Sequence, residues 1–565
     1  VLDRISDLEE QLPDVLGELA ALELILEKEH FPELAYMFKH ALVHDVAYAT
    51  LLAERRRSLH RLVGTAIEEL YGDRLAEQYE TLAHHYAESH DWEQALGYLD
   101  KAGDKAAAAY ANQEALGFYG RALQVCALLG EQWVATSAGI AAKRGFVDFA
   151  IGDVAAAIED FDRMAEAARA LGDRLLEGTA LASRGYMEML NLDFPGTERT
   201  MAKALAIVDE GVEEVRPLAN LVVCCHYAIT KRFPFPEVER FLISEDELAE
   251  LSDPFLQGTW SWVLGCFHIW RGHPHDTIRI LRGLPDAANL IITNRLWNWW
   301  TLAFALGTAG EYETALQVLE DTIRTCERVG DVPVHGRALN TIGWIHTQLH
   351  DHGRALEWNR RSLEFVQSHP EFPEPDIHMN ARLNIGIDLV ALGRTDEAEE
   401  QFRLVEKVAH GPLPEAFTFW RYSQRLYHSY GSLWLSRGDL VRAADYAERC
   451  LELAERNTSR KYIAQGRRLR TQIYMMQGRL DEAERDLSVA LEFATQVGNP
   501  PVLWQTYAAI GDLRLAQDRE KEARQAYGEA LLVIDNVAAS LTDEQLRDTF
   551  LTSTPVEAIR RLGAQ

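Results

Sequence analysis

The chain has 565 residues, with 57 Lys and Arg against 87 Asp and Glu, which gives a net charge of −30. A surface this acidic repels phosphate backbones, which argues against non-specific binding of DNA or RNA. Hydrophobic residues make up 47% of the chain, as in folded proteins, and no apolar run approaches the ~18 residues of a membrane helix. We therefore expect a folded cytoplasmic protein whose partners include neither nucleic acid nor membrane.

The six cysteines are too few and too scattered for a disulfide framework, and no C-x-x-C occurs. The adjacent pair Cys224 and Cys225 follows the apolar stretch Leu221–Val223. We interpret all six as buried small side chains in a reducing compartment. A redox role for the adjacent pair is the alternative.

Residues 1–45 predict helical segments followed by a short β-hairpin. Leucines recur at helical spacing between Leu2 and Leu22. Residues 23–27 and 35–39 are apolar and β-prone, and His30–Glu33 supplies a turn between them. Helices followed by a hairpin are typical of the end of a winged-helix unit, so we assign residues 1–45 to such a remnant. A chance pattern is the alternative, because each strand has only about five residues.

The following text carries a family resemblance. It runs through Phe38–Tyr48, Glu54–His60, Leu75–Gln78 and Leu82–Tyr86. These segments closely resemble bacterial multidomain proteins in which a class III adenylate/guanylate cyclase-like domain precedes a signal-transduction (STAND-type) ATPase and tetratricopeptide (TPR) repeats. The resemblance implies a connecting helix over residues 46–74 and the first TPR-like helices over residues 75–130. It is specific over residues 20–130 and generic elsewhere.

The same resemblance implies a nucleotide-binding module in the parent protein. This chain has no G-x-x-x-x-G-K-[ST] and no cyclase motif, so we expect no catalysis and no cofactor in the chain itself. ATP and Mg²⁺ would be bound only by an ATPase domain N-terminal to Val1. The absent initiator Met favours the hypothesis that the chain is the C-terminal portion of something larger.

Two features near residue 50 are candidates for communication with that module. In related ATPases a His near the end of the winged helix senses the nucleotide, and His40 is the candidate by position. The alternative is that His40 packs the hairpin against the next helix. Arg55, Arg56 and Arg57 form the strongest basic run, and they either contact the ATPase domain or form a solvated face that pairs with the acidic first 30 residues.

From residue 131 onwards a sequence pattern typical of a helical hairpin recurs at a period of about 40 residues. A small residue in a first helix is followed seven residues later by Gly or a stand-in such as His350 or Asp518. Five residues further comes a small residue on a second helix, and a bulky one follows at the next turn, where we expect it to fill the gap between repeats. The small residue of the second helix is Ala157, Thr197, Thr277, Ala315, Ala355, Ala398, Ala443, Ala483 or Ala523.

This pattern resembles the TPR family, with helices somewhat longer than the usual period of ~34 residues requires. We therefore predict an all-α fold, a TPR-like α-solenoid superhelix of helical hairpins preceded by the small winged-helix remnant. The extended array covers residues 131–535, and a capping helix or tail covers residues 536–565.

The resemblance also implies a ligand groove lined by the first helices. In TPR proteins the groove residues lie three positions before, one position after and four positions after the small residue of the first helix, which is Gly265, Ala303, Gly343 or Thr471 in the repeats used here. From this mapping we choose Trp262, Trp300, Phe304, Asn340, Trp344 and Arg468 as the candidate partner-binding residues. Aromatic anchors dominate peptide and protein interfaces. The alternative is that these rings pack between repeats.

No metal site is expected. His346 and His350 share a helix face with metal-ligand spacing, and His352 follows, but no carboxylate or Cys completes a tetrahedral set. We therefore interpret these histidines as packing residues. No H-E-x-x-H, G-x-S-x-G or G-x-G-x-x-G occurs.

Together these features predict a sensor and scaffold region of a signal-transduction ATPase or cyclase-like regulator. It would capture a peptide or protein in its groove and relay that event to an N-terminal ATPase or cyclase-like domain of the same parent. The alternatives are a stand-alone TPR adaptor and the non-catalytic part of a nucleotide cyclase.

Overall fold

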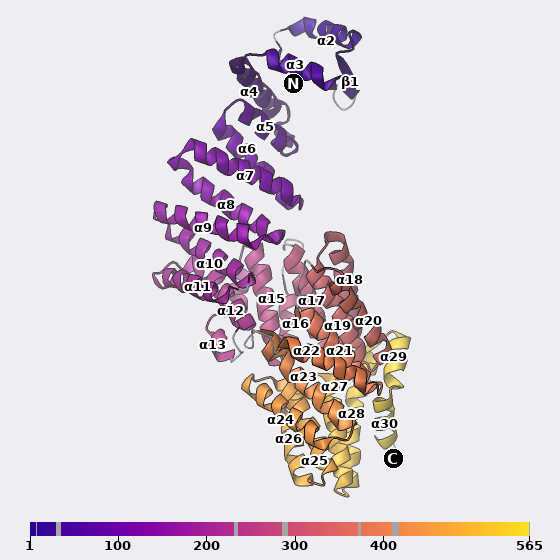
Figure 1. The fold of residues 1–565 in the computed structure, drawn as a ribbon. Helices are drawn as coiled ribbons and strands as arrows, with labels where there is room; N and C mark the ends of the chain where they lie inside the picture. Colours follow the sequence, from indigo (N-terminus) through magenta and orange to yellow (C-terminus); the bar gives the residue numbers. More distant parts are fainter. Residues whose placement is uncertain are drawn as a thin grey trace. The chain divides into compact units, whose positions relative to one another are not determined.

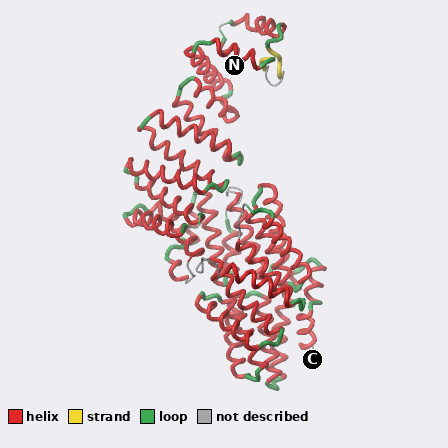
Figure 2. The backbone as a smooth tube through the Cα atoms, viewed as in Figure 1, coloured by secondary structure: helices red, strands yellow, loops and turns green. Residues whose placement is uncertain are grey.

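The computed structural model describes residues 1–6, 8–29, 35–191, 193–230, 235–284, 292–370, 375–409 and 417–563. In these ranges the regular structure is helical apart from one two-stranded sheet (Figures 1 and 2). The chain divides into two compact units, Val1–Val222 and Val223–Gln565. The predicted all-α solenoid of TPR-like helical hairpins is confirmed.

Unit 1 begins with short elements and the sheet. Strand β1 (Ile25–Glu29) pairs antiparallel with β2 (Ala35–Phe38), with Ile25 opposite Phe38. The predicted hairpin is therefore present, although its first strand starts two residues later than the sequence indicates. The turn expected at His30–Glu33 lies outside the described residues. The elements around the sheet are α1 (Leu2–Ile5), η1 (Glu9–Gln11), α2 (Leu12–Ala21), α3 (Ala41–Thr50) and α4 (Ala53–Leu70).

The rest of unit 1 is a row of antiparallel helices. They are η2 (Gly72–Gln78), α5 (Tyr79–Glu88), α6 (Trp92–Ala108), α7 (Asn112–Leu129), η3 (Glu131–Trp133), α8 (Val134–Ala150), α9 (Val154–Leu171), α10 (Arg174–Leu190), α11 (Phe194–Asp209) and η4 (Glu213–Val215). Helix α12 (Arg216–Thr230) contains the division between the units.

Unit 2 continues the hairpins. Its first helices are α13 (Phe235–Glu239), α14 (Glu245–Glu250), α15 (Pro254–Arg271), α16 (Pro274–Arg282), α17 (Ile292–Ala309), α18 (Tyr312–Val329), α19 (Val332–Gln348), α20 (His352–Gln367) and α21 (Pro375–Ala391). They are followed by α22 (Thr395–Ala409), α23 (Phe417–Ser436), α24 (Leu440–Arg456), α25 (Arg460–Met476), α26 (Leu480–Val497), α27 (Pro500–Ala516), α28 (Glu520–Ser540), α29 (Glu544–Leu551) and α30 (Thr554–Gly563).

The small residue of each first helix allows close packing inside its own hairpin. A Cβ added at Gly511 would lie 2.5 Å from Tyr527 Cε1, and one added at Gly185 would lie 2.6 Å from Met201 Sδ. The bulky residue sixteen positions later thus covers the small residue of the same hairpin. The sequence pattern had assigned that bulky residue to the gap between repeats instead.

The turn between the two helices of a hairpin adopts a left-handed conformation. Gly310 and Gly478 have φ of 93° and 74°. The predicted stand-ins His350 and Asp518 adopt the same region, with φ of 59° and 57°. L-residues avoid this region, so at these two turns the chain accepts a small strain to keep the hairpin geometry.

Unit 2 closes on itself. One hydrophobic cluster joins residues of α15–α19 with residues of α27–α30. Asn499 Nδ2 donates to the Thr308 carbonyl at 2.7 Å, across 191 positions of the sequence. Glu313 accepts hydrogen bonds from the Thr542 hydroxyl at 2.6 Å and the Thr542 amide at 2.7 Å. Repeats that are distant in sequence are therefore in direct contact.

Candidate functional site

A continuous run of aromatic rings crosses the first helices of three hairpins. The centre of the Trp262 ring on α15 lies 5.3 Å from the ring centre of Trp297 on α17, which lies 5.8 Å from that of Trp300. Trp300 stacks on Phe304 at 6.3 Å, and Phe304 contacts Trp344 on α19 at 5.0 Å. The four aromatic residues predicted from the repeat mapping thus belong to one connected row.

The rings of this row differ in exposure. Trp300 and Trp344 are only 8% and 7% exposed, and the Trp300 indole donates to Thr341 Oγ1 at 2.9 Å. Trp262 and Phe304 are half-buried, and the buried Trp262 Nε1–H finds no hydrogen-bond partner among the described residues. Trp300 and Trp344 therefore pack between helices in this structure, whereas the edges of Trp262 and Phe304 reach the surface of the row.

Trp297 was missed by the sequence mapping. It lies six positions before the small residue Ala303, and the mapping considers only three offsets. The spacing of Trp297, Trp300 and Phe304 along one helix face could have revealed it. The Arg337 guanidinium lies 4.5 Å from the Trp297 ring centre, and it pairs with Asp376 at 2.9 Å.

Asparagine side chains form a buried network beside the aromatic row. Asn340, which is 1% exposed, donates to Asn359 Oδ1 at 2.9 Å, and Asn384 donates to the same oxygen at 2.9 Å. Asn380 donates to Asn340 Oδ1 at 2.6 Å. The Arg425 guanidinium on α23 donates to both Asn380 and Asn384. The predicted residue Asn340 is therefore part of a fixed polar network.

Basic groups continue this face on α23 and α25. Lys461 Nζ lies 5.4 Å from the Trp344 ring centre, and Arg468 Nη1 donates to the Val502 carbonyl at 3.4 Å. Burial lowers the pKa of Lys461 to about 8 and that of Arg468 to about 10. Burial, with Arg468, Arg425 and Lys461 nearby, lowers the pKa of His428 to about 3. His428 is therefore neutral at physiological pH.

We call this surface of unit 2 the groove face. It is defined by residues of the first helices α15, α17, α19, α21, α23 and α25, namely Trp262, Trp297, Trp300, Phe304, Asn340, Trp344, Asn380, Arg425, His428, Lys461 and Arg468. Five of the six predicted groove residues lie in its aromatic row or amide network, and Arg468 lies among its basic groups.

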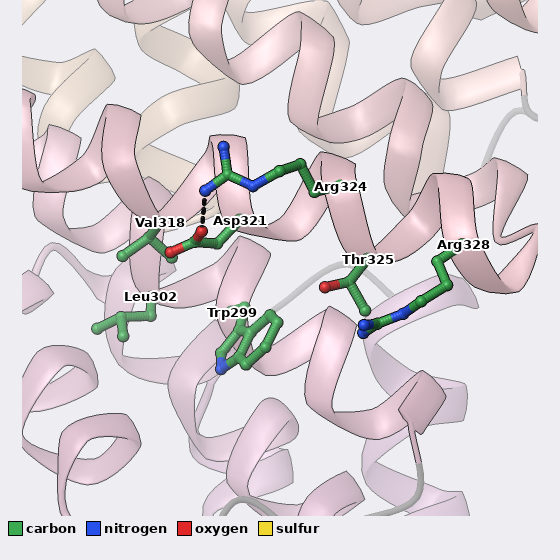
Figure 3. Close-up of a pocket in the computed structure, with 7 residues that line it drawn as sticks. All are labelled: Trp299, Leu302, Val318, Asp321, Arg324, Thr325 and Arg328. Carbon is green, nitrogen blue, oxygen red and sulfur yellow. Dashed lines mark hydrogen bonds and ion pairs between the residues drawn. The ribbon is translucent and has the colours of Figure 1, made fainter.

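A separate shallow pocket of about 500 Å³ lies between α17 and α18 (Figure 3). Its lining includes Trp299 and Leu302 of α17, on a different side of that helix from Trp300. Asp321 and Arg324 of α18 form an ion pair beside it. The pocket is not part of the groove face and provides a control surface.

The predicted packing role is confirmed for His346, in the last turn of α19, and for His350, which follows that helix. His346 is 5% exposed, and the His350 ring lies 5.5 Å from Trp504 of α27. His352 Nδ1 instead bonds the buried carboxylate of Asp388 at 2.9 Å. Within the described ranges no group of His, Cys, Asp or Glu is arranged to hold a metal ion.

The candidate residues near the N-terminus are mostly exposed. His40 precedes the first residue of α3, and its side chain is open to solvent. Arg55 and Arg57 are exposed on α4, while the Arg56 guanidinium lies 5.1 Å from the Tyr48 ring centre. The structure does not bury His40 against a neighbouring helix.

An apolar surface lies beside these residues. Leu42 and Val46 of α3 are 74% and 58% exposed, and Leu52 is 79% exposed. Such grouped exposure of large apolar side chains is typical of an interaction surface.

A histidine cluster joins α4 to α5 in unit 1. The Tyr48 hydroxyl lies 2.9 Å from His60 Nε2, and His60 Nδ1 lies 2.9 Å from His85 Nδ1. With both imidazoles neutral, Tyr48 donates to Nε2 of His60, whose Nδ1–H then donates to His85. Burial lowers the pKa of His60, and burial with His60 and His84 nearby lowers that of His85 to about 4.

This cluster predicts acid sensitivity of the α4–α5 contact. Because the folded pKa of His85 lies below its ordinary 6.5, its contribution to stability is complete above pH 6.5 and is lost as the pH falls towards 4. The full shift corresponds to about 3 kcal/mol, and solvent screening of this part-exposed ring reduces the expected loss to about 2 kcal/mol. The loss is measured as reduced hydrogen-exchange protection of α4 and α5. His85→Gln should flatten this dependence, and an equally steep dependence in the variant would contradict the assignment.

The six cysteines are free and buried. Burial raises the pKa of Cys225 and of Cys450 to about 12, so neither is a reactive thiolate at neutral pH. None of the helices in the described part of the chain combines the length and hydropathy that a bilayer crossing requires.

Residues 293–368 match the family model of the tetratricopeptide repeat. The match spans α17–α20, the two hairpins that carry most of the aromatic row. These residues form a tetratricopeptide repeat region. Arrays of such repeats present extended surfaces that are typical of protein-binding scaffolds. No curated protein matches this chain at a significant level.

Several solved structures are similar to this chain. A Rap protein in complex with competence and sporulation factor is 12% identical, with a TM-score of 0.49, and the similarity covers 65% of this chain and 99% of that chain. The Cut9–Hcn1 hetero-tetramer of the APC/C is 16% identical, with a TM-score of 0.41, and the similarity covers 92% of this chain and 94% of that chain. A tetratricopeptide repeat protein from Parabacteroides merdae is 15% identical, with a TM-score of 0.30, and the similarity covers 57% of this chain and 99% of that chain.

Proposed function

We propose that this chain is the protein-binding scaffold of a signalling protein and that the groove face of unit 2 captures a peptide or protein segment. The observation that carries the proposal is the combination on one face of half-buried aromatic rings with half-buried basic groups that form no ion pair among the described residues. Phe304 and Trp262 offer apolar contact, and Arg425, Lys461 and Arg468 offer the charged groups. Peptide-binding sites combine such anchors with a few fixed polar groups.

The amide network supports the same function. Asn340, Asn359, Asn380 and Asn384 satisfy one another and hold Arg425 in place. A side chain held by its neighbours loses little entropy when a ligand binds, which strengthens binding. The groove face is thus organised before any ligand arrives.

The test uses random peptides displayed on phage and selected on the full chain. We expect selected peptides to bind Phe304→Ala about tenfold or more weakly than the wild type, because aromatic anchors carry much of the energy of such interfaces. The matched control is Leu302→Ala, a half-buried residue of the same helix that lines the pocket of Figure 3. Failure to select any peptide, or equal losses in both variants, would contradict the proposal.

The N-terminal face serves the relay part of this function. The contact with an ATPase or cyclase-like module of the same parent is formed by polar and apolar side chains. These are the exposed His40, Arg55 and Arg57 and the apolar Leu42 and Leu52. The exposure of these residues supports this assignment. Binding in the groove can change the activity of that module only if it favours one arrangement over another. The test measures nucleotide turnover of the parent protein that carries His40→Ala together with Leu42→Asp. Unchanged turnover would contradict the proposed relay to that module.

A further inference from the structure

The groove face carries a cluster of three cations. Arg425, Lys461 and Arg468 make no ion pair in the part of the chain that the structure describes, and all three are half-buried. Lys461 makes no hydrogen bond there either; its ammonium group lies against the Trp344 ring. In a chain with 87 acidic residues against 57 basic ones, such a cluster is unexpected.

Neighbouring arginines on the same helix show the contrast. Arg467 and Arg470 of α25 both pair with the buried carboxylate of Asp486, at 2.9 and 2.6 Å. Arg468 lies between them in sequence and points to the groove face, where its contact is the Val502 carbonyl. The helix thus neutralises the arginines that face its hairpin partner and leaves the groove-facing one unpaired.

Among the described residues, Asp388 is a carboxylate that lies close enough to Arg425 to influence this cluster. It is fully buried, and it already accepts hydrogen bonds from His352 at 2.9 Å and from Thr347 at 3.0 Å. Burial raises the pKa of this carboxyl, and His352, Thr347 and Arg425 partly offset that effect. A single shared acid leaves the groove face with an excess of positive charge.

Unpaired cations in a half-buried face are costly, because each has lost part of its hydration without gaining a counter-charge. The lowered pKa values of Lys461, Arg468 and His428 have this same origin. An incoming anion would remove this cost. Arg425 retains N–H groups beyond the two that bond the asparagines, and Lys461, which lies against the Trp344 ring, retains all its donors.

We propose that the groove face selects acidic peptide segments, whose carboxylates are received by Arg425, Lys461 and Arg468 while a neighbouring apolar side chain contacts Phe304 and Trp262. This inference rests on the proposed function and names the class of ligand. Charge complementarity selects the occupant, because the three cations lie on a chain whose net charge is −30. That same net charge repels the long phosphate backbone of a nucleic acid.

The experiment uses a random peptide library selected on the full chain, followed by affinity measurements on the double variant Lys461→Gln with Arg468→Gln. We expect selected peptides to be rich in Asp and Glu and to lose about tenfold or more in affinity for the variant. Replacing their acidic residues by Asn and Gln should weaken binding to the wild type by a similar factor. Raised salt should weaken wild-type binding more than binding to the variant.

The matched control is Arg324→Gln with Arg328→Gln, which removes the same two charges beside the pocket of Figure 3. This control should leave the affinity unchanged. The thermal midpoint of the groove variant should equal or exceed that of the wild type, because no ion pair is broken. A lost affinity with an intact midpoint would therefore support a binding role for these cations.

The outcomes separate the two proposals. If no peptide binds the wild type, the proposed function itself fails. If peptides bind the wild type and the groove variant equally, or if they carry no excess of acidic residues, the function stands and the anion preference is overturned. The carboxylate assignment is also overturned if inorganic phosphate or phosphopeptides bind and unphosphorylated acidic peptides do not.

Discussion

Trp344→Ala should lower the free energy of unfolding of unit 2 by about 3–5 kcal/mol, the range for truncating a buried large aromatic. Trp344 is 7% exposed, contacts Phe304 at 5.0 Å and covers Gly307 of the preceding hairpin. Its removal leaves a cavity between α17 and α19 that the rigid helices cannot fill. Hydrogen exchange measured by mass spectrometry, with α17 and α19 followed separately, checks this prediction.

The result bears on how the groove face is tested. Because Trp344 supports the fold, a loss of partner binding in Trp344→Ala cannot by itself be assigned to a lost contact with the partner. The half-buried Phe304 offers a cleaner probe, with Leu302→Ala as its partner variant. If Trp344→Ala leaves exchange protection unchanged while peptide binding disappears, the ring is a binding residue and its packing is incidental.

Asp160→Ala should destabilise unit 1 by about 3–5 kcal/mol, because it removes one partner of a buried ion pair. Asp160 is fully buried in α9 and accepts two hydrogen bonds from the Arg144 guanidinium of α8, one of them at 2.7 Å. Its loss leaves that guanidinium, which is 22% exposed, without its ion-pair partner. Reduced exchange protection of both helices is the expected readout.

Arg163→Ala provides the control for Asp160→Ala. Arg163 also contacts Asp160, at 3.2 Å, but its side chain is 54% exposed. An exposed ion pair contributes at most about 1 kcal/mol. Similar losses in both variants would show that the burial of the Arg144–Asp160 pair is not what stabilises the hairpin.

The repeat made the fold predictable. A small residue, a left-handed turn and a second small residue recur at a period near 40, and each has a local physical cause. His350 and Asp518 could be recognised as turn residues because they occupy the glycine position of the phrase. The aromatic row followed from the same register, apart from Trp297, which falls outside the three offsets considered.

The polar contacts could not be predicted in this way. Arg144 pairs with Asp160, and at equivalent positions of a later hairpin Arg470 pairs with Asp486. Other hairpins use a different arrangement, in which Tyr527 donates to Asp512 at 2.6 Å. Each arrangement depends on which side chains two facing helices happen to offer. The lack of ion pairs at the cations of the groove face could not be predicted for the same reason, because pairing depends on which side chains are neighbours in three dimensions.

The closure of unit 2 has a consequence for how it folds. In an open solenoid each repeat touches only its neighbours, so that folding can begin anywhere and spread along the chain. Here Asn499 bonds Thr308 and Thr542 bonds Glu313, across 191 and 229 positions. Forming such contacts requires a large loop to close before any reward is gained, and this slows folding. We therefore expect unit 2 to acquire its helices quickly and its closing contacts in a later step, with α27–α30 the last helices to gain full protection.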